Sequence, residues 1–215
     1  MVIGAEAVEK LSRSSVAVVG IGGVGGIAAE ALARSGVGRL LLVDGDIVEE
    51  TNLNRQIVAF RSSIGRNKAD VMAEQVRDIN PEIKVEPHPV FFTNDEFPLE
   101  GLDYVLDAID SADDKVQLVK RCRDLGIPVI SAMGAGNKLD PMAFRVTTIE
   151  YTSIDPFAKV MRKKYREAGL DGVKVVFSTE KPVKTGSATP GSFMPVVAAA
   201  GLLMAAEVVK DLTVK

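Results

Sequence analysis

Short apolar runs alternate with stretches of helical spacing through the first 140 residues of the chain. The apolar runs predict strands at residues 15–19, 39–43, 83–86, 103–108 and 129–132. Apolar positions that recur every three or four residues predict helices at residues 25–35, 68–79 and 112–125. Because the strands are continuously apolar, they are typical of a mostly parallel sheet that helices cover on both faces. The pattern therefore predicts an α/β fold.

The pattern changes after residue 140. It predicts two more strands, at residues 143–149 and 173–177, with a basic helix at 155–168 between them. A closing apolar helix is predicted at 195–209. A polar segment at 178–192 is long for a connection without secondary structure, which suggests a substrate lid and equally allows a disordered crossover. We expect one continuous domain over 1–215, with a nucleotide-binding part at 1–140 and a substrate-binding and dimerisation part at 141–215.

Composition places the chain among ordinary globular proteins, with 47% hydrophobic residues, 26% charged residues and a net charge of −3. No apolar run is long enough to cross a membrane, and the first residues lack the basic head and apolar segment of a signal peptide. We therefore expect a cytoplasmic protein without membrane contact. The charge disfavours general affinity for nucleic acid but allows a local basic patch.

The chain has one cysteine, Cys122, and one histidine, His88. A single cysteine excludes an intramolecular disulfide and any zinc site built from cysteine pairs. We expect Cys122 to be a small core residue of its helix. His88 stands between two prolines, and we expect it in a loop. Thiol catalysis and histidine acid–base catalysis are therefore disfavoured.

The glycine-rich stretch VAVVGIGGVGG at 16–26 follows a predicted strand and opens a predicted helix. Its glycines, with the spacing of the dinucleotide-binding turn of Rossmann-like folds, are Gly20, Gly22, Gly23 and Gly25. They let the backbone approach phosphates, and the helix N-terminus offers free N–H groups. Asp44, at the end of the next strand, can accept ribose hydroxyls. These features alone would suit a nicotinamide-dependent oxidoreductase.

Further polar residues indicate a triphosphate with magnesium instead. They follow the second and fourth predicted strands or begin the helix at 68, and they are Asp46, Asn52, Arg55, Gln56, Lys68, Asp107 and Asp110. Cationic and amide side chains bind phosphate oxygens, and a carboxylate at the end of a strand can hold the metal. Hydride transfer leaves Arg55, Lys68 and Asp110 without a role. We therefore expect attack on the α-phosphate of ATP, with pyrophosphate leaving, and assign these three residues to catalysis.

In order and spacing, these motifs resemble those of the adenylating enzymes related to ubiquitin-activating and sulfur-carrier-activating proteins. The resemblance over 16–110 implies that Asp44 holds the ribose and that Asp110 holds magnesium. It also implies that the phosphates are held by Asn52, Arg55, Gln56 and Lys68.

The second half resembles one branch of that family, the tRNA threonylcarbamoyladenosine dehydratases. The matching stretches are Gly134-Ala-Gly136-x-x-x-Asp140-Pro141, Asp155-Pro156, Val176-Phe-Ser-Thr-Glu180 and Gly191-Ser192. This resemblance implies that ATP activates the carboxylate of the threonylcarbamoyl group on an adenosine next to the anticodon. The group then closes a ring with net loss of water, which needs position and no enzyme thiol. The alternative is adenylation of the C-terminal glycine of a ubiquitin-like sulfur carrier.

The resemblance also implies partners. We expect a homodimer, for which the apolar helix at 196–204 is a candidate contact surface and equally a candidate core element. The basic cluster at 159–166 is a candidate RNA contact or a solvated helix face. A sulfur-transfer partner and a monovalent cation near 134–136 stay open.

Relatives usually carry an N-terminal arginine that reaches the ATP of the partner subunit. The first arginine here, Arg13, does not match that position, and we do not transfer the role to it. A nucleotide-binding scaffold without catalysis is therefore a third hypothesis.

Overall fold

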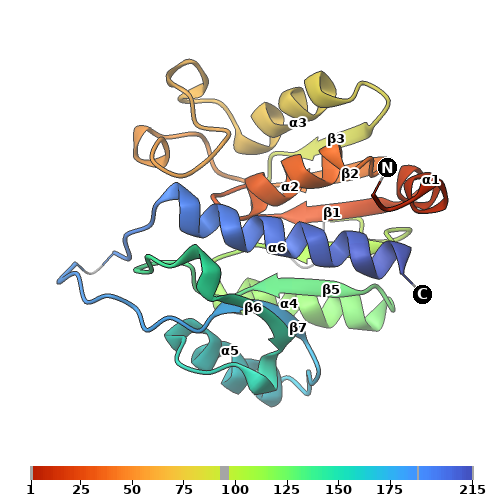
Figure 1. Ribbon diagram of the computed structural model, residues 1–215. Helices are drawn as coiled ribbons and strands as arrows, with labels where there is room; N and C mark the ends of the chain where they lie inside the picture. The colour runs from red at the N-terminus through yellow and green to blue at the C-terminus, as the bar shows by residue number, and fades with distance from the viewer. Residues whose placement is uncertain (1, 93–96, 188, 215) are drawn as a thin grey trace.

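The computed structural model describes residues 2–92, 97–187 and 189–214, which form one layered α/β structure (Figure 1). A single sheet within these residues has the strand order β3-β2-β1-β4-β5-β7-β6. The strands are β1 (Ser15–Val19), β2 (Arg39–Val43), β3 (Lys84–His88), β4 (Tyr104–Asp107), β5 (Val129–Ala132), β6 (Phe144–Thr148) and β7 (Lys174–Ser178). Neighbouring strands are parallel, except that the edge strand β6 runs antiparallel to β7.

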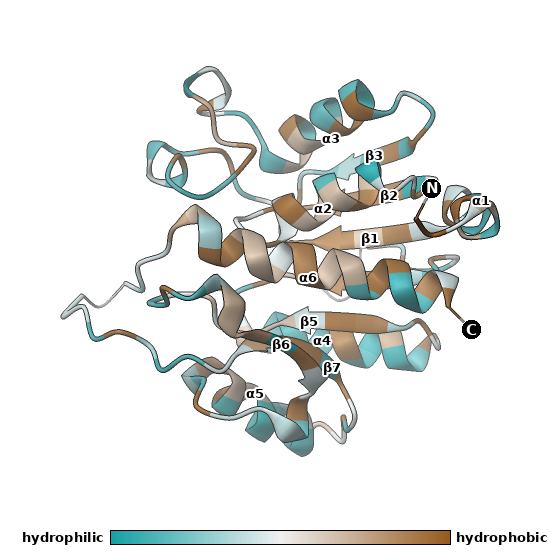
Figure 2. Ribbon diagram, viewed as in Figure 1, coloured by the Kyte–Doolittle hydropathy of each residue, from teal (hydrophilic) through white to brown (hydrophobic). Residues whose placement is uncertain are grey.

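Helices cover both faces of the sheet. The helices are α1 (Ala5–Ser12), α2 (Gly25–Arg34), α3 (Lys68–Ile79), α4 (Ala112–Asp124), α5 (Pro156–Glu167) and α6 (Met194–Thr213). Alternate residues of β1 serve the two faces: Val16 and Val18 pack with α2, α3 and α6, whereas Ala17 and Val19 belong to the core under α4. Figure 2 shows the apolar character of the central strands that this double burial requires.

The α/β fold class predicted from the apolar pattern is confirmed. The bounds of β1, β2, β5 and α3 are those predicted from the pattern, and the other predicted elements differ by a few residues at their ends. Helix α1 was not predicted, because its eight residues bury only Leu11 and Gly4 provides no side-chain cap. Among the helices described, none is long and apolar enough to cross a membrane.

The prediction that His88 lies in a loop is wrong. His88 ends strand β3, paired with Val43, and its ring packs edge-on against Phe97 at 5.0 Å between centroids. The strand continues through Pro87 because β3 is an edge strand, so a residue without an N–H need not interrupt a ladder on its outer side.

Residues on both sides of position 140 contribute to the same sheet, since β6 and β7 extend the edge that begins with β5. Helix α6 then returns across this sheet and packs on α2, so that the end of the chain lies against its beginning (Figure 1). The parts at 1–140 and 141–215 therefore share one sheet and one core cluster.

Candidate active site

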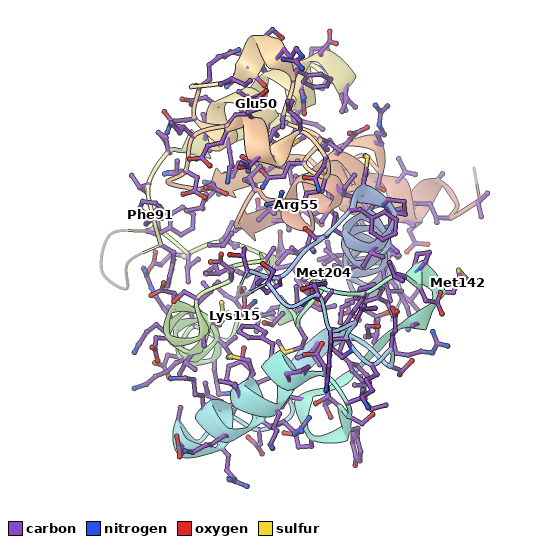
Figure 3. The ribbon with its side chains drawn as sticks, turned by 90° about the vertical axis from the view of Figure 1, so that its left-hand side faces the viewer. Glu50, Arg55, Phe91, Lys115, Met142 and Met204 are labelled. Carbon is purple, nitrogen blue, oxygen red and sulfur yellow. The ribbon has the colours of Figure 1, made fainter. Side chains whose placement is uncertain are left out.

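The chain changes direction across the sheet between β1 and β4, and a cavity of about 480 Å³ lies at the carboxyl ends of these strands. A parallel sheet opens a ligand crevice at such a point, because the connections leave on opposite sides. Figure 3 looks onto this edge, where Arg55 and Phe91 lie on two sides of the opening. The cavity is lined by most of the residues predicted to bind the nucleotide: Gly20, Gly22, Gly23, Asp44, Asp46, Asn52, Arg55, Gln56, Lys68 and Asp110.

The glycine turn joins β1 to α2 at the floor of this cavity. Gly25 does not line the cavity, but it allows the turn to close: a Cβ on Gly25 would lie 1.8 Å from the carbonyl oxygen of Gly20. The first residues of α2 have no side-chain cap, and although the N–H of Gly26 donates to the carbonyl oxygen of Gly22 at 2.9 Å, the other N–H groups of the turn can meet an anion. The turn can therefore receive a phosphate on backbone groups alone.

Asp44 follows β2, and its side chain connects two backbone segments, the glycine turn and the loop after β2. Its carboxylate accepts hydrogen bonds from the N–H of Ile21, at 2.6 Å, and from the N–H of Asp46, at 2.8 Å. Burial raises the pKa of Asp44, while these two bonds and the charge of Lys68 act in the opposite direction. Each carboxylate oxygen keeps a second acceptor position, so Asp44 fixes the glycine turn and can still accept a ribose hydroxyl.

Lys68 is the first residue of α3 and lies buried beside the cavity. Its Nζ is 2.8 Å from Oδ2 of Asp46, and its backbone N–H donates to the carbonyl oxygen of Asp46. The stem is enclosed by protein while the Asp46 carboxylate is half exposed. This arrangement holds an ammonium at the cavity wall with only one of its three donors engaged by a carboxylate.

The short helix η1 (Glu50–Asn52) and the turn after it supply the opposite wall. The side chain of Asn52 is buried and accepts from the N–H of Glu49 at 3.0 Å, which fixes its orientation. Arg55 donates through Nη1 to the carbonyl oxygen of Thr51 at 2.7 Å and to Oδ1 of Asn54 at 2.9 Å, which leaves its Nη2 and Nε donors for a ligand. The buried Oε1 of Gln56 has no hydrogen-bond partner within the part of the chain described. A bound ligand with a donor group would satisfy it.

Asp110 lies after β4 and is exposed at the cavity mouth. The cap of α4 is Ser111, whose Oγ accepts from the N–H of Asp114, so Asp110 is not engaged as a helix cap. The described residues contain no group of three His, Cys, Asp or Glu side chains that would hold a metal alone. Magnesium commonly uses one or two carboxylates together with substrate phosphates, and Asp110 fits that requirement.

The prediction that Asp107 contacts the nucleotide is corrected by the structure. Asp107 is fully buried and does not line the cavity. Its carboxylate pairs with the buried ammonium of Lys115 at 3.1 Å and accepts from the hydroxyl of Ser131 at 2.6 Å. It also accepts from the N–H of Ile109 at 3.1 Å, and so fixes the turn that presents Asp110. Asp107 turns away from the ligand because its cation lies behind the strand, on α4.

Three residues after β3 line the cavity but were not predicted: Val90, Phe91 and Phe92. Phe91 is 67% exposed and presents an aromatic ring, while Phe92 is buried. A ring of this kind offers a stacking surface for a nucleobase. Two adjacent aromatic residues a few positions after the carboxyl end of β3 are the sequence signal that would have identified them.

A second cavity, of about 390 Å³, adjoins the first. Both are lined by Val24, Ala108, Ile109 and Asp110, so the two spaces meet at the candidate metal carboxylate. The rest of the second cavity is mostly apolar and includes Met133, Ala135, Phe157, Pro182 and Pro190. A nucleotide in the first cavity and a second substrate in the other would face one another at Asp110.

The family model for ThiF proteins matches residues 1–215. The tRNA threonylcarbamoyladenosine dehydratase of Bacillus subtilis is 45% identical over 233 residues, which cover 99% of this chain and 92% of that protein. The Escherichia coli dehydratase is 43% identical over 188 residues, with 82% and 70% covered. The crystal structure of the E. coli enzyme in complex with ATP superposes with a TM-score of 0.91 at 40% identity, covering 97% of this chain and 89% of that one. The chain belongs to the ThiF family.

Proposed function

We propose that the protein is an ATP-dependent tRNA threonylcarbamoyladenosine dehydratase. The observation that carries the proposal is the pair of cavities that meet at Asp110, one bordered by the glycine turn and the other by apolar walls. Two relatives with 45% and 43% identity are dehydratases of this kind, and E. coli structures of that enzyme contain ATP or AMP. A tRNA substrate implies a cytoplasmic protein.

The first cavity supplies the groups that adenylation of a carboxylate requires. The substrate carboxylate attacks the α-phosphate, the bond to the β-phosphate breaks, and pyrophosphate leaves. Arg55, Lys68 and the N–H groups of the glycine turn stabilise the negative charge that develops on the phosphate oxygens. Asn52 and Gln56 orient the phosphates, and Phe91 stacks on the base. Magnesium, when bound at Asp110, neutralises charge on the phosphates.

The second cavity suits the modified adenosine. Its apolar walls, including Met133 and Phe157, can pack a base that has been taken out of its stack. The acyl-adenylate then lies next to the carbamoyl group of the same substituent. An atom of that group attacks the activated carbonyl, AMP leaves, and a proton is lost from the substituent, so a ring forms with net removal of water. The chain contributes position to this step and no covalent nucleophile.

Helix α5 is our proposed RNA contact. Its exposed cations, Lys159, Lys163 and Arg166, lie on the element that starts at the second cavity. Arg162 donates to the carbonyl oxygen of Thr152 at 2.9 Å, and Lys164 pairs with Asp113. These two side chains are therefore occupied by contacts within the protein, and we do not assign them to RNA. The exposed cations can contact phosphates without sequence preference.

The protein is also proposed to act as a homodimer. Exposed apolar side chains lie on the outer side of α6 and around the short helix η3 (Pro141–Ala143), which contacts α6. They are Leu139, Met142, Phe193, Met194 and Leu202. Figure 2 shows the apolar character of α6 along most of its length. A second copy on this surface would remove it from water.

Two expectations from the sequence receive different support. The shared sheet supports one functional domain over 1–215, in which both parts are needed for the paired cavities. The carbonyl oxygen of Gly134 already accepts a hydrogen bond from Lys138. We therefore do not extend the proposal to a monovalent cation at this carbonyl.

The test is pyrophosphate release from ATP and magnesium with two substrates side by side: tRNA bearing threonylcarbamoyladenosine, and a carrier protein ending in two glycines. The tRNA is then digested, and the mass of its modified nucleoside is measured by mass spectrometry. We expect release with the tRNA and a nucleoside lighter by one water. Release only with the carrier protein would assign the chain to sulfur-carrier activation instead. ATP binding without release from either substrate would indicate a nucleotide-binding scaffold.

A further inference from the structure

A second buried ion pair, apart from Lys115 and Asp107, lies in the wall of the second cavity. Lys138 and Asp155 are each about 1% exposed at the side chain, and the Lys138 Nζ is 2.6 Å from Oδ2 of Asp155. The same ammonium donates to the carbonyl oxygen of Gly134. The other oxygen of Asp155 accepts from the N–H of Ala158 at 3.0 Å and caps the start of α5. The pair therefore joins the loop after β5 to the basic helix.

Each partner follows a residue other than glycine that has a positive φ. Asn137, before Lys138, has φ 56°, and Ile154, before Asp155, has φ 63°. Among the described residues other than glycine, these two have a positive φ. A β-branched residue such as Ile154 is rarely found there, and such conformations persist only where the surrounding structure imposes them. Ile154 is therefore held in this conformation by its surroundings, which include the buried pair next to it.

Asn137 holds the long connection between β7 and α6. Its N–H donates to the carbonyl oxygen of Gly191 at 2.6 Å, and its own carbonyl accepts from the N–H of Val183 at 2.7 Å. Its side-chain oxygen accepts from the N–H of Gly191 at 2.7 Å. These three bonds fix two parts of the connection close to Pro182 and Pro190, which border the second cavity.

The approach of the loop to this connection is close. A Cβ on Gly136 would lie 2.7 Å from the Cβ of Pro190, so the backbone at 136 can have no side chain on that side. A small displacement of the loop would therefore move the connection, and with it one wall of the cavity. Asp155, the other member of the pair, caps the start of α5, and the cations of α5 lie on the turns that follow.

We propose that the Lys138–Asp155 pair is a positioning element for the second substrate of the reaction. It holds the loop at 134–138 in the conformation that lets Asn137 secure the connection, and it fixes the start of α5 against the same cavity. The pair thereby fixes the positions of RNA bound to the cations of α5 and of a modified nucleoside in the cavity relative to Asp110. The inference rests on the proposed function for the identity of this substrate.

The decisive variant is the neutral double substitution Lys138→Met with Asp155→Asn. Asparagine still caps α5, and no unpaired charge is left in the interior, so the variant is expected to fold. The control is Arg123→Met, which removes an exposed ion pair between Arg123 and Asp171, 2.8 Å apart, that joins α4 to the loop after α5. Thermal unfolding and the affinity for ATP with magnesium are measured first, and both are expected to match the unsubstituted protein.

Two readouts then test the pair. Turnover of tRNA bearing threonylcarbamoyladenosine should fall about 10²-fold in kcat/KM in the double variant, with the KM for ATP unchanged, because misplacement of a reacting group by about 1 Å has an effect of that size. Hydrogen exchange at the amides of Asn137, Val183 and Gly191 should become faster in the double variant and not in the control.

Unchanged exchange at these amides in the folded double variant overturns the inference, and so does unchanged kcat/KM with the RNA. If the unsubstituted protein itself does not act on the RNA, the proposed function fails. The exchange measurement still decides whether the pair positions the loop, because it needs no substrate.

Discussion

Lys68 and Asp46 come from different elements, yet their side chains meet at 2.8 Å and the backbone N–H of Lys68 also donates to the carbonyl oxygen of Asp46. This double connection fixes the first turn of α3 to the loop after β2. It places a buried ammonium at the wall of the nucleotide cavity. This side chain is already fixed before a phosphate binds, whereas a solvated lysine would lose its mobility on binding.

Substituting Lys68→Met should lower the rate of adenylation by about 10²- to 10³-fold, the usual effect of removing one group that stabilises transition-state charge. Stability should change little, because the Asp46 carboxylate left behind is 55% exposed and can be hydrated. The measurement is pyrophosphate release with saturating modified tRNA. Arg66→Met is the matched control, since its exposed pair with Glu74 lies outside the cavity. Equal loss in both variants would contradict the role of Lys68.

Asp110→Asn should raise the magnesium concentration needed for half-maximal pyrophosphate release and lower the maximal rate, because an amide is a poorer ligand for the ion than a carboxylate. The fold should be unaffected, since Ser111 caps the following helix. Asp113→Asn on the first turn of α4 removes the same charge without lining the cavity. An unchanged magnesium dependence in Asp110→Asn would show that the metal assignment is wrong.

Lys115→Met should destabilise the protein by about 3–5 kcal/mol, because it leaves the carboxylate of Asp107 buried without its cation. Burial alone lowers the pKa of Lys115, and the charge of Asp107 opposes that shift. Urea unfolding measures the loss. Combining Lys115→Met with Asp107→Asn removes both charges and should recover most of the stability. If the single variant were as stable as the parent, the pair would have no role in holding the turn before Asp110.

Cys122 should be inert in the folded protein. Burial raises the pKa of its thiol to about 12, so the reactive thiolate is scarcely populated near neutral pH. A thiol reagent in mildly alkaline buffer should modify the protein only after unfolding in urea. Cys122→Ala should keep its turnover, and loss of turnover in that variant while it remains folded would favour a thioester mechanism.

The sequence by itself determined most of the helices and strands and the order of the phosphate-binding groups. Continuous apolar runs required burial on both faces, which only an inner strand between two helical layers provides, and the glycine spacing identified the turn after β1. It also located the start of α3 at Lys68, since that residue opens a regular helical period. These features are local: each depends on neighbours within a few residues, so each can be read along the chain.

The tertiary structure decided which side chains meet. Asp107 and Asp110 are separated by two residues and looked alike in the sequence, but Asp107 pairs with Lys115 and Ser131 inside the protein whereas Asp110 stands at the junction of two cavities. The Lys138–Asp155 pair and the place of Phe91 depend in the same way on which strands are neighbours. A buried charge takes the partner that the strand order brings within reach, and that order is a property of the whole sheet rather than of any stretch of sequence.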